Sequence, residues 1–67
     1  MWTEELQQQT RKLFETLPMA AMKHFGDSKY GVCVLDNGKY IITDRESDDT
    51  WEYDSIDALI VDGWAID

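Results

Sequence analysis

An Asn-Gly pair between two apolar runs, in the middle of the chain, constrains the fold more than any other feature. The runs cover residues 32–35 and 40–43, and both are rich in β-branched and aromatic side chains. A tight type I′ turn needs positive φ at its two central positions, which Asn tolerates and Gly adopts without steric cost. Asn37-Gly38 therefore predicts a β-hairpin with Asp36 opposite Lys39. A three-residue loop with Gly38 in a bulge is the alternative register.

Both faces of this expected hairpin are apolar, since successive side chains of a strand point to opposite sides. One face carries Val32, Val34, Ile41 and Thr43. The other face carries Cys33, Leu35, Tyr40 and Ile42. A strand that is apolar on both sides is usually covered on both sides or pairs with another chain. The sequence thus predicts either helices on two sides of a sheet or an exposed apolar surface used in association.

Residues 2–17 predict an amphipathic helix. Thr3 suits the N-cap position, and Glu4 and Glu5 suit the positive end of the helix dipole. Helical spacing brings the apolar side chains and one threonine to a single face that we expect to be buried. That face consists of Leu6, Thr10, Leu13, Phe14 and Leu17.

A second short helix is expected directly after Pro18. Proline lacks a backbone N–H and disfavours helical geometry at the residue before it, so the first helix should break there. Proline also suits the first turn of a new helix, and Gly26 suits its left-handed C-cap. Residues 19–25 are therefore interpreted as helix, and residues 27–29 as loop.

The last third of the chain predicts a strand, a helix and one further strand. Residues 51–53 alternate as a short strand after a polar loop, and a helix over residues 56–60 is closed by Gly63. Alternation in the tail allows a fourth strand at residues 64–66. The order is α-α-β-β-β-α with this optional final strand. We interpret residues 1–67 as one small α+β domain, an antiparallel sheet packed with helices.

Charge is distributed unevenly along the chain. The formal net charge is -8. It arises from residues 31–67, which contain ten acids but only two basic residues, Lys39 and Arg45, whereas the charges of residues 1–30 sum to zero. Such a field repels nucleic acid and anionic membranes and attracts basic partners. The expected partner is a protein with a basic surface, without direct binding of nucleic acid or membrane.

The location expected from the sequence is the cytoplasm. The apolar runs fall short of the roughly 20 residues that a membrane helix needs. The first residues are acidic and lack the basic region and apolar stretch of a secretory signal. A single cysteine rules out an internal disulfide, which favours a reducing compartment or independence of redox state.

The acidic loop at residues 44–49 is the first candidate for metal chemistry, because carboxylates bind hard cations such as Ca²⁺. It lacks the glycine at position six and the glutamate at position twelve of an EF-hand, counted from Asp44. Charged loops are commonly only solvated. We predict no metal site and no cofactor.

Catalysis is not expected either. Cys33 and His24 are the only thiol and imidazole, too few for zinc, and a Cys–His nucleophile needs both groups within hydrogen-bond reach. Cys33 has the surroundings of a small buried hydrophobic residue. Carboxylate pairs are abundant, but so short a chain offers little room for a substrate cleft.

The sequence therefore favours a non-enzymatic binding module. Its expected contact residues are Asp44, Glu46, Asp48, Asp49, Glu52, Asp54 and Asp57. Trp2, beside the start of the first helix, is a candidate interface anchor. A sharper form is an inhibitor that imitates nucleic-acid phosphates and occludes a nucleic-acid-binding surface. The alternative is a self-associating structural or regulatory subunit that forms a homodimer through an apolar face of the hairpin.

Overall fold

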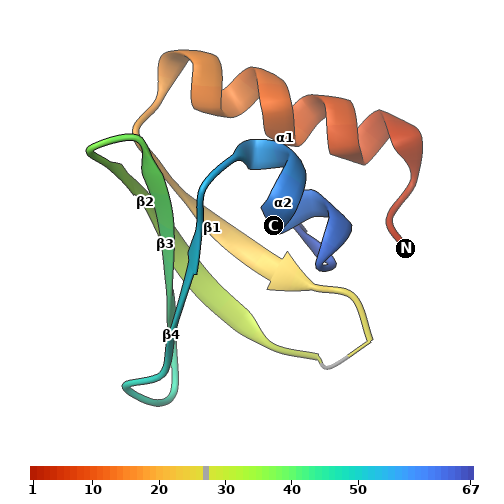
Figure 1. The fold of residues 1–67 in the computed structure, drawn as a ribbon. Helices are drawn as coiled ribbons and strands as arrows, with labels where there is room; N and C mark the ends of the chain where they lie inside the picture. Colours follow the sequence, from red (N-terminus) through yellow and green to blue (C-terminus); the bar gives the residue numbers. More distant parts are fainter. Residues whose placement is uncertain (27) are drawn as a thin grey trace.

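The computed structural model describes residues 1–26 and 28–67 and shows an α+β fold (Figure 1). The elements, in chain order, are α1 (Glu4–Thr16), β1 (Met19–His24), β2 (Tyr30–Asp36), β3 (Lys39–Asp44), β4 (Thr50–Tyr53), α2 (Ile56–Val61) and β5 (Trp64–Ile66). The five strands form one sheet in the order β4-β3-β2-β1-β5, and every pairing is antiparallel. Four strands thus follow one another as a meander, and the last strand returns to the far edge beside β1.

The central hairpin has the predicted two-residue turn. Asp36 pairs with Lys39 and Val32 with Thr43, and the register between them is the one expected from the Asn-Gly turn. Asn37 and Gly38 have φ of 53° and 81°, as a type I′ turn requires. The alternative three-residue loop is therefore excluded.

The first helix is confirmed, and part of its expected buried face is buried. Thr3 is the N-cap, and its side chain accepts a hydrogen bond from the Leu6 backbone N–H. Thr10 and Phe14 are the buried residues of α1. Leu17 follows the helix in extended conformation and is half exposed, because Pro18 excludes helical geometry there. The expected burial of Leu17 on a helix face was wrong.

The predicted second helix over residues 19–25 was also wrong, because residues Met19–His24 form strand β1. Pro18 sends the chain out of α1 in extended conformation, and β1 then pairs on one side with β2 and on the other with β5. Two ladders of hydrogen bonds outweigh the helix propensity of this segment. Gly26 still adopts positive φ, 95°, but after a strand. Ser28 lies in the connection to β2; Asp27, the first residue of the expected loop, lies outside the described residues.

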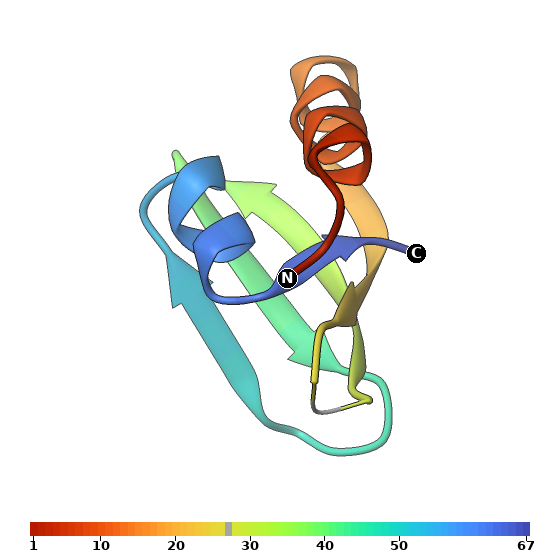
Figure 2. The same cartoon turned by 90° about the vertical axis from the view of Figure 1, so that its right-hand side faces the viewer.

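Both helices cover the same side of the sheet, so the fold has two layers (Figure 2). The core lies between these layers. It consists of Phe14 of α1, Leu59 of α2, and Met22, Cys33, Ile42 and Trp64 of the sheet. The tail is confirmed as the additional strand β5, whose Trp64 is 1% exposed. One side of the sheet is thus covered, and the other carries no element among the described residues.

Candidate partner-binding surfaces

The seven acidic residues predicted to bind a partner follow one edge of the sheet. β4 is the strand at that edge, and all seven lie on it, on the segments that flank it, or at the start of α2. Asp44 ends β3, and Glu46, Asp48 and Asp49 lie in the β3–β4 loop. Glu52 lies on β4, Asp54 follows it, and Asp57 lies in the first turn of α2. The β3–β4 loop is at the opposite end of the sheet from the β2–β3 turn (Figure 1). The four-residue strand, about 13 Å long, therefore separates the loop acids from Asp54 and Asp57.

Two side chains of the β3–β4 loop bind the loop's own backbone. The Asp44 Oδ1 accepts hydrogen bonds from the backbone N–H groups of Glu46 at 2.7 Å and Ser47 at 3.1 Å. The Ser47 hydroxyl in turn accepts one from the Asp49 N–H. These are the local side-chain bonds by which Asp and Ser stabilise turns. In the described part of the chain, no group of three or more metal-ligating side chains comes together.

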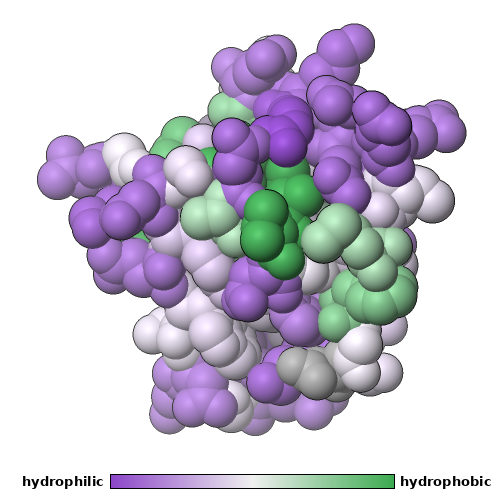
Figure 3. All heavy atoms as spheres, turned by 45° about the vertical axis from the view of Figure 1, so that its right-hand side comes forward, coloured by the Kyte–Doolittle hydropathy of each residue, from purple (hydrophilic) through white to green (hydrophobic). Residues whose placement is uncertain are grey.

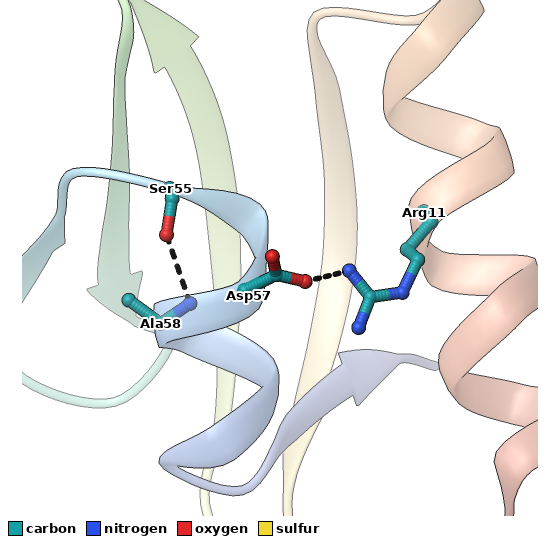
Figure 4. A network of polar contacts seen from close by, with 4 residues as sticks. All are labelled: Arg11, Ser55, Asp57 and Ala58. Atoms are coloured by element: carbon teal, nitrogen blue, oxygen red, sulfur yellow. Dashed lines mark hydrogen bonds and ion pairs between the residues drawn. The ribbon is translucent and has the colours of Figure 1, made fainter.

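At the other end of β4, cations partly balance the acids. The Lys39 Nζ lies 2.9 Å from Asp54 Oδ1 and 3.2 Å from Glu52 Oε1. Hydrogen bonds to Asp54 and then Glu52 raise the pKa of this exposed lysine above its ordinary value. Arg11 of α1 reaches Asp57 beside the cap in which Ser55 accepts a hydrogen bond from the Ala58 N–H at 3.1 Å (Figure 4). Surface ion pairs of this kind contribute little to stability, but they lower the net charge of this end.

Trp2 is engaged within the chain. Its indole Nε1 donates a hydrogen bond to the Gly63 carbonyl at 2.8 Å, and its ring contacts Phe25 edge-to-face with centroids 5.3 Å apart. The Lys23 Nζ lies 4.9 Å from the centre of the same ring. Trp2 is half-buried and ties the chain ahead of α1 to the junction between α2 and β5.

Cys33 and His24 are not brought together. Both belong to the covered side, but Cys33 pairs across the ladder with Ala20, four residues from His24 on β1, which is about 13 Å along a strand. Burial raises the pKa of the Cys33 thiol to about 11, which opposes formation of a thiolate nucleophile. The His24 Nε2 lies 2.6 Å from the Asp62 carbonyl oxygen, and the ring packs edge-to-face on Trp64.

Two hollows were not anticipated from the sequence. The larger, about 570 Å³, lies between the β1–β2 and β3–β4 loops. Its lining residues are Ser28, Lys29, Tyr30, Asp44, Arg45 and Glu46. The smaller, about 140 Å³, is lined by His24, Lys29, Trp51, Asp62 and Trp64. The β2–β3 register brings Tyr30 beside Arg45 at the larger hollow. The smaller hollow also needs β1 as a strand, because His24 of β1 lines it.

An aromatic and carboxylate cluster closes the covered side near the smaller hollow. The Tyr53 hydroxyl donates to the Asp62 carboxylate and accepts a hydrogen bond from the Trp64 Nε1 at 3.0 Å. Burial, together with the Asp62 carboxylate, raises the pKa of Tyr53 to about 12. The hydroxyl therefore stays protonated at neutral pH and acts as a structural bridge.

The uncovered side of the sheet carries the apolar hairpin face that the helices leave exposed. Its first row across the strands is Met19, Val34, Ile41 and Glu52. Its second row is Ala21, Val32, Thr43 and Thr50. Met19 is 54% exposed and Val34 41%. This open face, defined as the sheet side away from α1 and α2, is the exposed apolar surface named in the second of the two expected outcomes. Its use in association stays a prediction.

The helix-bearing side is different in character. Seen from that side, small hydrophobic areas lie among hydrophilic side chains (Figure 3). The exposed hydrophobic residues of the helical segments are isolated ones, such as Val61 on α2 at 71%. Within the described residues, no helix is both long and apolar enough to cross a membrane.

Comparisons with protein-family models, with curated proteins and with solved structures gave no match. The functional assignment is therefore argued from the surfaces described above.

Proposed function

We propose that this chain is a non-enzymatic protein-binding module whose β4 edge binds a basic surface of a partner protein. The observation that carries the proposal is the number of acids on and beside that strand. Seven carboxylates fall between residues 44 and 57, on and around a strand that pairs only with β3 among the described residues. A basic partner would gain electrostatic attraction over the whole length of the edge.

The β3–β4 loop is the part of this edge that contributes most. Glu46, Asp48 and Asp49 are exposed, and their carboxylates make no ion pair with any described residue. Glu52, Asp54 and Asp57 already contact Lys39 or Arg11. A partner's lysine or arginine gains more from a carboxylate that is not already neutralised. We further propose that the partner surface covered by the β4 edge is the one with which the partner binds nucleic acid.

The absence of catalysis is part of the same proposal. Cys33 and His24 lie apart, and the thiol is buried with a raised pKa. The hydroxyl of Tyr53 is occupied by Asp62 and Trp64. A binding role uses the exposed carboxylates directly and needs none of these groups.

The test is binding of a lysine-rich peptide to two triple variants with the same change in charge. One is Glu46→Gln/Asp48→Asn/Asp49→Asn in the loop; the other is Glu5→Gln/Glu15→Gln/Asp67→Asn, which neutralises exposed acids away from β4. We expect the loop variant to weaken binding about tenfold, and the matched control by less than about threefold. Affinity should also fall as salt is added. Equal weakening by both variants would mean that overall charge attracts the peptide, and would refute the β4 edge as the site.

A further inference from the structure

The two edge strands of the sheet differ in how their outer sides are covered. At the β5 edge, α1 contacts the strand, and the Thr10 Oγ1 accepts a hydrogen bond from the Ile66 N–H at 3.2 Å. At the other edge, β4 is the outermost strand, seen at the left of Figure 2, and it pairs only with β3 among the described residues. An uncovered edge strand is a template on which a further strand can pair.

The register of β4 determines which of its backbone groups face outward. The Asp44 N–H donates to the Asp49 carbonyl at 2.9 Å, and hydrogen-bonded pairs recur at every second position of an antiparallel ladder. Trp51 therefore directs its backbone groups to β3, whereas Thr50 and Glu52 direct theirs away from β3. In the described part of the chain, no other segment bonds to these outward groups. The edge thus presents two N–H donors and two C=O acceptors.

The side chains at this edge differ between the two sides of the sheet. Trp51 and Tyr53 belong to the covered side and are only partly buried. Thr50 and Glu52 belong to the open face and are exposed. A strand added beside β4 continues this alternation. Its apolar side chains would cover the two rings, and its basic side chains would lie beside Glu52 and, farther along, beside the acids of the β3–β4 loop.

Charge decides what kind of strand can pair there. A second copy of β4 would bring its own seven acids against those of the first copy, and like charges on neighbouring strands repel. A strand that carries lysine or arginine is attracted instead. Recognition by strand addition takes its affinity from main-chain hydrogen bonds and its specificity from alternate side chains. The occupant that fits this edge is therefore an extended basic segment rather than another copy of the chain.

We propose that the partner adds such a segment to β4 as a sixth, antiparallel strand of the sheet. This inference rests on the proposed function, because it names the form in which the basic partner meets the β4 edge. The segment alternates basic residues, on the side of Glu52, with apolar residues on the side of Trp51. Residues directly opposite Thr50 and Glu52 exchange N–H···O bonds with them, so the basic residues of the segment provide the backbone bonds.

Two N-methylated peptides of equal charge test this arrangement. Both have an alternating lysine–valine sequence; one is N-methylated at its lysines and the other at its valines. Lysine N–H groups face β4 in the proposed ladder, and valine N–H groups face away. Methylation at lysine should therefore weaken binding about tenfold or more relative to the unmethylated peptide, and methylation at valine by less than about threefold. A shift by one residue cannot restore the bonds without placing lysines against Trp51. Equal affinities, or a greater loss from methylation at valine, would overturn the proposal.

A proline at position 50 tests the same bonds from the protein side. The N–H that it removes points away from β3, so the ladder to β3 is kept, as is usual for proline in edge strands. Thr50→Pro should weaken binding of the unmethylated alternating peptide about tenfold or more, whereas Thr50→Val, which keeps the N–H, should change it by less than about threefold. Equal effects of the two variants would contradict strand addition.

Amide hydrogen exchange keeps the proposal testable if Thr50→Pro fails to fold. In the wild-type chain, exchange at Glu52 should slow about tenfold or more when the alternating peptide binds. Unchanged exchange at Glu52 in the bound state would overturn the added strand. The two proposals fail in different experiments. Equal weakening by the loop and control triple variants removes the acidic edge as the site, whereas equal binding of the two methylated peptides removes only the added strand.

Discussion

The two faces of the sheet are built from the same kinds of residue but reach opposite states. Cys33 and Ile42 on the covered face are 0% exposed, whereas their neighbour Val34 on the open face is 41% exposed. Neighbours in sequence thus differ almost completely in burial, because alternation sends one toward the helices and the next away from them. Apolar character therefore does not decide which face forms the core. The placement of α1 and α2 does.

The covered face carries the larger side chains. Trp51, Tyr53 and Trp64 supply bulk there, and their polar atoms find partners such as the Tyr53–Trp64 hydrogen bond. The two central rows of the open face carry aliphatic side chains, two threonines and the carboxylate of Glu52. A core that must fill the space beneath two helices needs large side chains. The comparison teaches that side-chain size, not hydropathy, distinguishes these two faces.

The largest effect on stability, and the largest difference between the faces, should come from truncating one isoleucine on each face. Ile42→Ala removes a fully buried side chain beneath the helices, and should cost about 2–5 kcal/mol of unfolding free energy because it leaves a cavity. Ile41→Ala, on the open face, should cost about 1 kcal/mol or less when the chain is dilute enough to be monomeric. Urea unfolding measured by tryptophan fluorescence gives both values.

Similar losses in the two isoleucine variants would contradict the comparison, since the open face would then be as well packed as the core. Repeating the Ile41→Ala measurement at high protein concentration sharpens it. A loss that grows with concentration indicates that Ile41 is buried between two copies.

A smaller effect should follow from the one buried polar side chain of α1. Thr10 is fully buried, and its Oγ1 donates to the Leu6 carbonyl at 2.9 Å and accepts from the Ile66 N–H of β5 at 3.2 Å. Thr10→Val keeps the shape but leaves the Ile66 N–H without a partner, at a cost of about 1–3 kcal/mol. Thr10→Ser keeps the hydroxyl and should cost about 1 kcal/mol.

Amide hydrogen exchange at Ile66 distinguishes the two threonine variants. Exchange should accelerate in Thr10→Val and stay slow in Thr10→Ser, because only the valine variant lacks the acceptor. If valine is tolerated as well as serine, the hydroxyl does not hold β5 to α1, and the covered face is stabilised by apolar packing alone.

Local chemistry predicted those elements whose signals are short-range. The Asn37-Gly38 turn determined the hairpin register, and Thr3 determined the start of α1. In each case a few adjacent residues contain the whole signal, because turns and caps satisfy backbone groups within three or four positions.

The errors concern segments whose structure depends on distant partners. Residues Met19–His24 contain two alanines and two methionines, which favour helix in isolation, but their ladders to β2 and β5 exist only in the assembled sheet. The same error hid the smaller hollow, which His24 of β1 lines, and the fact that the open face extends onto β1. The abundance of acids in the second half of the sequence pointed to the acids of the β4 edge. The ion pairs of Lys39 and Arg11 could not be predicted in this way, because they join residues 13, 15 and 46 positions apart.

The smallest effect on stability is expected from ionisation of the Cys33 thiol, which should matter only in alkaline solution. Burial raises the pKa of the Cys33 thiol from 9.0 to about 11, so the folded state favours the neutral thiol. This contribution to stability is fully present below pH 9 and is lost as pH rises through about 11, because the unfolded chain releases its proton first. Cys33→Val should therefore lessen the loss of stability that begins near pH 9. The loss due to Tyr53, whose pKa is raised from 10.0 to about 12, should begin about one pH unit higher and remain.

Moving the thiol across the sheet completes this test. In Cys33→Val/Val34→Cys the thiol is moved by one residue along β2, which places it on the open face. In dilute solution at about pH 8 this thiol should react with a neutral disulfide reagent about tenfold or more faster than the wild-type thiol. Thr43→Cys, in the same background, checks that the open face rather than position 34 is responsible. Equal rates for the wild-type and relocated thiols would mean that β2 exposes both of its sides. The contrast between a covered and an open face would then fail at the centre of the sheet, where it is expected to be sharpest.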